Sequence, residues 1–91
     1  MRIDKYLKVA RVLKRRATGK SLALNDRLYI NGRHAKAGSE VKPGDILTVV
    51  FGQRELKIRV LAVAEHVRKE EAADLFEVLE EKVRDDLEQD Q

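Results

Sequence analysis

Cysteine is absent from this 91-residue chain, and histidine is scarce, with only His34 and His66. Without thiols the chain can form neither a disulfide nor a thiolate metal site, and two histidines are too few for a structural zinc site. Only four residues are aromatic. A protein that stacks successive bases of a single strand on aromatic rings would need more of them. We therefore expect no metal and no cofactor.

Long apolar runs are also missing. No stretch approaches the roughly 20 apolar residues that a membrane span needs. The first eight residues, MRIDKYLK, carry charges throughout and lack the apolar segment of a signal peptide. These absences predict a cytoplasmic protein with no membrane partner. A chain of this length makes one small unit that buries about 60–65% of its unfolded surface.

Charge is present in abundance and is distributed unevenly. Residues 1–59 hold 15 Lys and Arg against 5 Asp and Glu, whereas residues 60–91 hold 4 against 11. The net charge of +3 hides this asymmetry. Such a pattern indicates a polyanion-binding face in the first part of the chain and an acidic segment in the second.

Two helices are predicted at the start of the chain. Apolar side chains recur every three to four residues over residues 2–13, with Asp4 and several cations on the opposite side. A shorter helix is expected over residues 17–25, and its weak buried stripe is predicted to comprise Ala17, Ser21, Leu24 and Leu28. This helix is too short to be stable alone and must pack on the first. In this pattern Asp4 is a helix-capping and ion-pairing residue.

Three consecutive cations, residues 14–16, are predicted to end the first helix and to form the joint to the second. Cations suit a helix C-terminus. Three adjacent cations exceed that need and repel one another, a cost that a bound phosphate would offset. A merely solvated charged turn is the alternative interpretation.

Strand signals fill the middle of the chain. Residues 27–30 alternate polar and apolar, and Asn31-Gly32 is a strong hairpin-turn signal because both residues accept positive φ. Pro43-Gly44 predicts a second turn, followed by a strand over residues 46–51 and another over about residues 56–62. These elements predict a small, curled antiparallel sheet.

Helical spacing returns from about Arg68. Ala72, Phe76, Leu79 and Val83 fall on one stripe, with acidic residues elsewhere, and residues 85–91 are polar enough to fray. We therefore expect an α+β fold of two N-terminal helices packed on the sheet, plus an acidic C-terminal helix. The chain divides into an N-terminal unit, residues 1–64, and an acidic helical extension, residues 65–91.

No constellation of catalytic groups is recognisable. The sequence contains no phosphate-binding glycine loop, and Ser21 and Ser39 have no arrangement of His and acid around them. His34 lies beside the hairpin turn among cations, with no carboxylate or nucleophile adjacent in sequence to orient it. The sequence predicts that the protein is not an enzyme.

The positive signal is a cationic surface suited to phosphate. Nine cations occur between residues 2 and 27, against only Asp4 and Asp26. Because the second helix offers few side chains that read DNA base edges, folded RNA is the favoured polyanion. The candidate RNA-binding residues are Arg2, Asp4, Lys5, Lys8, Arg11, Lys14, Arg15, Arg16, Lys20, Arg27, Asn31 and His34.

Five segments in order resemble a known RNA-binding unit. They are MRIDKYL at residues 1–7, KRRA at 14–17, RLYING at 27–32, AK at 35–36 and VKPGD at 41–45. Together they are similar to the ribosomal-protein-S-four RNA-binding domain, the alpha-L motif, over roughly residues 1–60. The whole chain, with FGQ at 51–53 and KEEAA at 69–73, resembles the RqcP-like stand-alone proteins, which are related to heat-shock protein fifteen.

The resemblance implies a concrete role. RqcP-like proteins take part in bacterial ribosome-associated quality control, where they bind large ribosomal subunits obstructed by peptidyl-tRNA. They contact rRNA and tRNA, and they support an RqcH-like protein that adds a C-terminal alanine tail to the stalled chain. The positions matching Arg2, Asp4 and Arg16 belong to the RNA-contacting surface, which makes Asp4 an organiser of neighbouring basic side chains. We expect a monomer.

The sequence departs from the family pattern at two positions, Ala10 and Asp26. Ala10 replaces a residue that is often small and polar, and Asp26 replaces a frequent glycine and brings a negative charge beside Arg27.

Two other functions are open. One alternative is a heat-shock-type factor that recycles obstructed large subunits, although that type carries a longer basic C-terminal extension. The other is a protein-interaction adaptor that uses the acidic C-terminal stripe.

Overall fold

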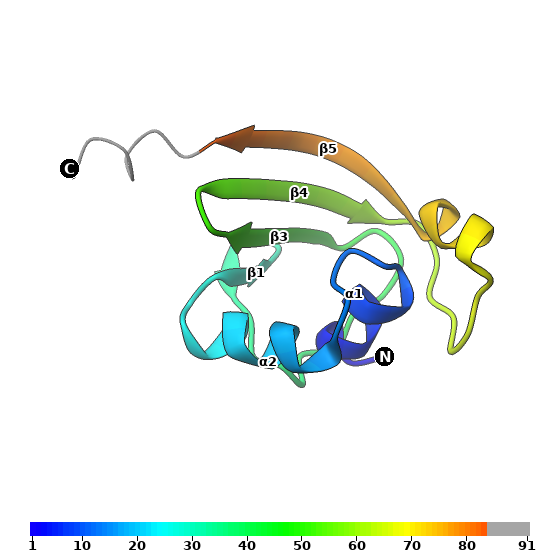
Figure 1. The fold of residues 1–91 in the computed structure, drawn as a ribbon, viewed down its shortest axis with the longest axis horizontal. Helices are drawn as coiled ribbons and strands as arrows, with labels where there is room; N and C mark the ends of the chain where they lie inside the picture. The colour runs from blue at the N-terminus through cyan, green and yellow to red at the C-terminus, as the bar shows by residue number, and fades with distance from the viewer. Residues whose placement is uncertain (84–91) are drawn as a thin grey trace.

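A computed structural model describes residues 1–83 of the chain. It contains two α-helices, a 3-10 helix and a five-stranded antiparallel sheet in the order β2-β1-β3-β4-β5. The elements in chain order are α1 (Ile3–Val9), α2 (Arg16–Leu24), β1 (Leu28–Ile30), β2 (Arg33–His34), β3 (Ile46–Phe51), β4 (Arg54–Val60), η1 (Lys69–Leu75) and β5 (Phe76–Val83). In Figure 1 both helices lie near β1 and β3, and β5 runs along the far edge of the sheet. Among the described residues, no helix is long and apolar enough to cross a membrane.

The first helix is shorter than its periodicity predicts, because it ends at Val9. Arg11 takes a left-handed backbone conformation with φ of 61°, and the amides of Val12 and Leu13 both donate to the carbonyl of Leu7. This reversal buries Leu13 against the core. The predicted joint at residues 14–16 is therefore wrong in detail: the loop begins at residue 10, and Arg16 is the first residue of α2.

The predicted buried stripe of the second helix is wrong for its helical members. Leu28, the last member of the predicted stripe, is buried, but it lies in β1. Ala17, Ser21 and Leu24 are exposed, whereas Gly19 and Leu22 are the buried residues of α2. The reason is a close approach of the two helices: a Cβ atom on Gly19 would lie 3.2 Å from both Cα and Cβ of Asp4. Gly19, which lowers helix propensity, thus allows α2 to pack directly on α1.

The predicted turns are confirmed. Asn31 and Gly32 have φ angles of 51° and 82°, and they connect a hairpin in which Tyr29 pairs with His34. Gly44 has φ of 96° in the turn before β3. Asp26 takes φ of 57°, so it makes the turn in which the resemblance has a glycine. The antiparallel sheet itself is confirmed as well.

The acidic C-terminal helix is wrong for residues 76–83, which form β5 and pair with β4. Directly across from one another lie three pairs of opposite charge: Arg59 and Glu77, Lys57 and Glu80, and Glu55 and Lys82. Opposite charges in such positions each stabilise a sheet by about 0.2–1 kcal/mol. The edge of β4 and its complementary charges therefore outweigh the helical spacing of the isolated segment.

Three further predictions concern the helix from about residue 68, the fraying of residues 85–91 and the division of the chain at residue 64. Residues 69–75 are helical, but as the 3-10 helix η1, which buries Ala72 and Leu75. Residues 85–91, which we expect to fray, lie outside the described residues. The division of the chain at residue 64 stays a prediction, and β5 belongs to the same sheet as β1.

Tyr6 links the N-terminal helix to the end of η1. Its side chain is fully buried, and its hydroxyl donates a hydrogen bond of 2.6 Å to the carbonyl of Leu75. Burial raises the pKa of Tyr6 to about 12, because the interior disfavours the charged phenolate. Around Tyr6 the core combines α1, the loop at residue 13, α2, the sheet and η1. Its fully buried apolar members include Ile3, Leu7, Leu28, Leu47, Val49 and Ile58.

We predict that Tyr6→Phe lowers the free energy of unfolding by about 1 kcal/mol in urea denaturation, because it removes one buried hydrogen bond and keeps the ring. The loss is moderate because the Leu75 carbonyl also accepts the backbone amides of Leu61 and Ala62. Tyr29→Phe is the control, with an expected change within about 0.5 kcal/mol. Equal effects of the two substitutions would contradict the role of the Tyr6 hydroxyl.

We also predict an alternating pattern of amide hydrogen exchange along β5. In an antiparallel edge strand every second amide bonds to the neighbouring strand and the others face solvent. Nuclear magnetic resonance should therefore show slow and fast exchange in alternation on either side of Leu79, where the pairing of β5 with β4 shifts by one residue and interrupts the alternation. The second half of α2 provides an internal reference for consecutive protection. Consecutive protection through residues 76–83 would instead indicate a helix and would contradict the strand.

Candidate nucleic-acid interface

Asp4 is the single buried charged residue among residues 1–83, with no exposed surface. It lies in the first turn of α1, where the helix dipole favours a carboxylate. Burying a carboxylate is costly unless charged and hydrogen-bonded partners surround it. The partners of Asp4 therefore define the most constrained polar site on this side of the molecule.

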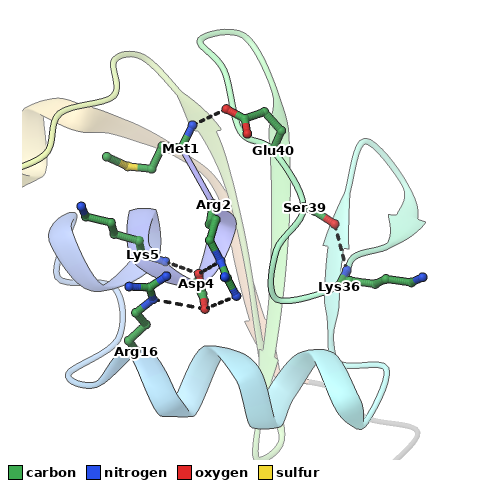
Figure 2. Close-up of polar contacts among 8 residues, drawn as sticks. All are labelled: Met1, Arg2, Asp4, Lys5, Arg16, Lys36, Ser39 and Glu40. Carbon is green, nitrogen blue, oxygen red and sulfur yellow. Dashed lines mark hydrogen bonds and ion pairs between the residues drawn. The ribbon is translucent and has the colours of Figure 1, made fainter.

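Two arginines and one backbone amide supply those partners (Figure 2). Arg2 donates from Nε to Oδ1 at 3.2 Å and from Nη2 to Oδ2 at 3.3 Å. Arg16 places its Nε 3.2 Å from Oδ2, and the Lys5 amide donates to Oδ1 at 2.8 Å. The carboxylate thus joins the residue before α1 to the first residue of α2. We call Asp4, Arg2 and Arg16 the Asp4 cluster.

The arginines of the Asp4 cluster are anchored and still accessible. The Arg2 side chain is 48% exposed and the Arg16 side chain is 43% exposed. A guanidinium has five N–H donors, and Arg16 meets Asp4 through Nε. Donors on both arginines are therefore available to a phosphate outside the protein. Ordering these side chains in advance reduces the entropy cost of binding.

The loop before β3 fixes the position of Arg2. Arg2 forms an isolated antiparallel bridge with Glu40, and the Ile3 amide donates to the carbonyl of Ser39 at 2.8 Å. The N-terminal amine also forms an ion pair with Glu40. Gly38 faces the Arg2 guanidinium, with its Cβ position 3.8 Å from Nη2. The start of the chain is thus held in register beside this loop (Figure 2).

A second group of predicted residues lines a hollow beside the end of α1. Lys8, Arg11 and Lys14 form its basic side, and Glu65 and His66 form the other. Lys5 borders this hollow, because its ammonium lies 2.5 Å from the Glu65 carboxylate. The hydrogen bond and the charge of Lys5 lower the pKa of Glu65. An acidic residue from the second half of the chain thus lies against the predicted basic surface.

The remaining predicted residues are not brought into one site. Asn31 braces its turn, since its side chain bonds to the Asp45 carboxylate and accepts the Ile46 amide. His34 stacks against Tyr29 with ring centroids 4.6 Å apart. Arg27 donates to the carbonyl of Gly52 at 3.4 Å. These contacts are structural and leave the RNA-binding roles of Asn31, His34 and Arg27 as predictions.

Lys36 is a cation that the sequence interpretation omits. It lines a groove together with Arg2 and Lys20, although 34 residues separate Arg2 from Lys36 in the chain. The only available signal was the resemblance at residues 35–36. Periodicity could not find it, because the return of residues 36–40 to the side of α1 is a tertiary contact. Arg15 and Lys20 are exposed, as predicted for a basic surface.

We predict that Asp4→Asn lowers the free energy of unfolding by about 1–2 kcal/mol, because it removes the charge that pairs with both arginines. The estimate is below that for a fully buried pair, since both arginines are half-exposed. Urea denaturation measures the change. Asp26→Asn is the matched control: Asp26 is 76% exposed, and asparagine also accepts its backbone conformation. An Asp4 variant as stable as the control variant would contradict the cluster.

Comparison with known proteins places this arrangement in a family. Residues 1–47 match the family model described as S4 domain. A protein of Bacillus subtilis, named RQC P-site tRNA stabilizing factor, is 49% identical over 89% of this chain and 94% of its own length. A protein of the same name in Halalkalibacterium halodurans is 48% identical over 89% of this chain and 92% of its own length.

Longer proteins are more distant in sequence and close in fold. A heat shock protein 15 homolog of Aeromonas salmonicida is 33% identical over 84% of this chain and 58% of its own length. The solved structure of heat shock protein 15 from Vibrio cholerae, described as trimeric, superposes with a TM-score of 0.79 at 28% identity. It covers 86% of this chain and 80% of that one. The chain belongs to the S4 domain family and, within it, to the family of the RQC P-site tRNA stabilizing factors.

Proposed function

We propose that this protein is a non-catalytic RNA-binding factor of bacterial ribosome-associated quality control. It acts in the cytoplasm on large ribosomal subunits that peptidyl-tRNA obstructs, and it contacts both rRNA and the tRNA. The names of the relatives that match nearly the whole chain support the process and the tRNA contact. The Asp4 cluster supports the mode of binding.

The observation that carries the proposal is the pair of half-exposed arginines held by one buried carboxylate. Arginine is suited to phosphate because its planar fork can engage two oxygens at once. The cluster combines two arginine charges with one carboxylate charge, so it keeps one net positive charge. Lys8 on α1 and Arg11 and Lys14 in the loop after α1 extend the positive surface. An RNA backbone read by shape needs such fixed cations more than it needs base-specific side chains.

Support of an RqcH-like protein is the finer part of the proposal. A factor that holds tRNA on the obstructed subunit would keep the substrate of alanine tailing in place between additions. The chain needs no catalytic group of its own for that role. A monomer is sufficient for it, although the related Vibrio cholerae protein is described as trimeric.

The two alternative functions are less well supported. The match covers 58% of the heat shock protein 15 homolog at 33% identity and 94% of the Bacillus subtilis protein at 49% identity, so the similarity to the second protein is greater. The adaptor hypothesis depended on an acidic apolar stripe of a C-terminal helix. Residues 76–83 form β5 instead, where Glu77 and Glu81 pair with Arg59 and Arg54.

We predict that Arg16→Ala weakens binding to purified large subunits carrying P-site tRNA by about tenfold, because it removes one anchored phosphate ligand. The slope of the logarithm of affinity against the logarithm of salt concentration should decrease by about one unit. Arg54→Ala is the charge-matched control. Its side chain pairs with Glu81 on the β4–β5 edge, and its affinity should stay close to that of the unmodified protein.

Urea denaturation of both variants separates binding from folding. Arg16→Ala also removes one partner of Asp4, so the comparison is made under conditions in which each variant is fully folded. Affinity that is unchanged by Arg16→Ala would contradict the role of the Asp4 cluster. Affinity of the unmodified protein that is flat between about 50 and 200 mM salt would contradict phosphate binding altogether.

A further inference from the structure

A groove beside α2 has a chemistry that the phosphate-binding surface does not require. Its apolar lining consists of Ala23, Leu24 and Ala37, from the last turn of α2 and the loop before β3. Three cations, Arg2, Lys20 and Lys36, complete its lining, and no carboxylate contributes to it. One wall of the groove is therefore the Arg2 side chain that Asp4 holds in place.

Leu24 is the most exposed large apolar side chain of residues 1–83, at 85%. Single exposed leucines are common on protein surfaces. Leu24 differs because two alanines extend its apolar surface and cations surround that surface. The end of α2 does not depend on it: the Asn25 side chain donates to the carbonyl of Ser21, and Leu22 provides the buried contact. The fold leaves this side chain without a partner in the described chain.

The residues that line the groove indicate which kind of ligand fits it. An apolar peptide would leave three cations without counter-charges, and a fully paired RNA helix would present phosphates and keep its base faces stacked inside. An unpaired nucleotide offers both chemistries within one residue. Its base has an apolar face, and phosphates lie on either side of it. Base faces stack in a way that tolerates different sequences, because every base has one.

We propose that this groove holds one unpaired nucleotide of the bound RNA. The base lies against Leu24 and the neighbouring alanines, and the flanking phosphates contact Arg2, Lys20 and Lys36. The inference rests on the proposed function, since it assumes that RNA is the ligand of this side of the molecule. It adds that the protein distinguishes a loop or bulge from continuous duplex through an aliphatic contact.

Binding of two RNA hairpins tests the proposal. One carries ordinary nucleotides in its loop, and the other carries abasic nucleotides at every loop position, so that the phosphates and riboses are the same. The full-length protein should bind the ordinary hairpin more tightly. Leu24→Ala should weaken binding to the ordinary hairpin by about three- to tenfold, the effect of removing about one or two buried CH₂ groups, and should leave the abasic hairpin unaffected. Leu61→Ala, at another exposed leucine that is 46% accessible, is the matched control and should bind as the unmodified protein does.

Each other result has a definite meaning. Equal affinity of the unmodified protein for both hairpins, or an equal loss for both with Leu24→Ala, overturns the nucleotide site and leaves the proposed function intact. Failure to bind either hairpin or large subunits overturns the proposed function itself. If Leu24→Ala reduces binding to large subunits while both hairpins bind as before, the groove holds a protein segment and the nucleotide site is overturned.

Discussion

The buried carboxylate of Asp4 is the constraint on which the N-terminal half of this structure depends. A carboxylate without exposed surface must be compensated, and the compensation comes from residues on both sides of the loop between the helices. Arg2 precedes α1 and Arg16 begins α2, so pairing both with Asp4 sets the relative position of the two helices. Gly19 suits this close approach, since a Cβ atom there would lie only 3.2 Å from Cα and Cβ of Asp4.

The pairing of Asp4 with Arg2 and Arg16 also contributes to the proposed binding surface. Long arginine side chains on a surface normally lose about 2 kcal/mol of rotamer entropy when they are ordered by a ligand. In this molecule Asp4 has already ordered two of them, and both side chains remain about half-exposed. The cationic surface is thereby divided into parts with different chemistry: an anchored arginine pair, a basic hollow that Glu65 also lines, and a groove with a partly apolar lining.

A second constraint, the open edge of β4, decides the structure of the C-terminal part. Strand β4 alternates buried apolar residues with charges, and without β5 its edge would expose unpaired backbone groups. Residues 76–83 provide the complementary charges, so that acidic β5 covers basic β4. The charge asymmetry between the two halves of the chain is thus used within one sheet, in addition to forming a positive surface elsewhere. The periodicity of the isolated segment suits a helix, but isolated periodicity contains no information about a partner strand.

Local features of this chain were readable from its sequence alone. The absence of cysteine and the excess of cations limited the chemistry, and Asn31-Gly32, Gly44 and Asp26 marked turns because few other residues accept positive φ. Periodicity located α1 and α2 to within a few residues, and the landmarks between residues 1 and 45 indicated the family and drew attention to Arg2, Asp4 and Arg16. Only the tertiary structure decided that Arg11 reverses the chain after α1, that Lys36 joins Arg2 in a groove, and that residues 76–83 form a strand. Each of these depends on contacts between residues distant in sequence, and the energy of such contacts exceeds the small local preferences that a pattern can report.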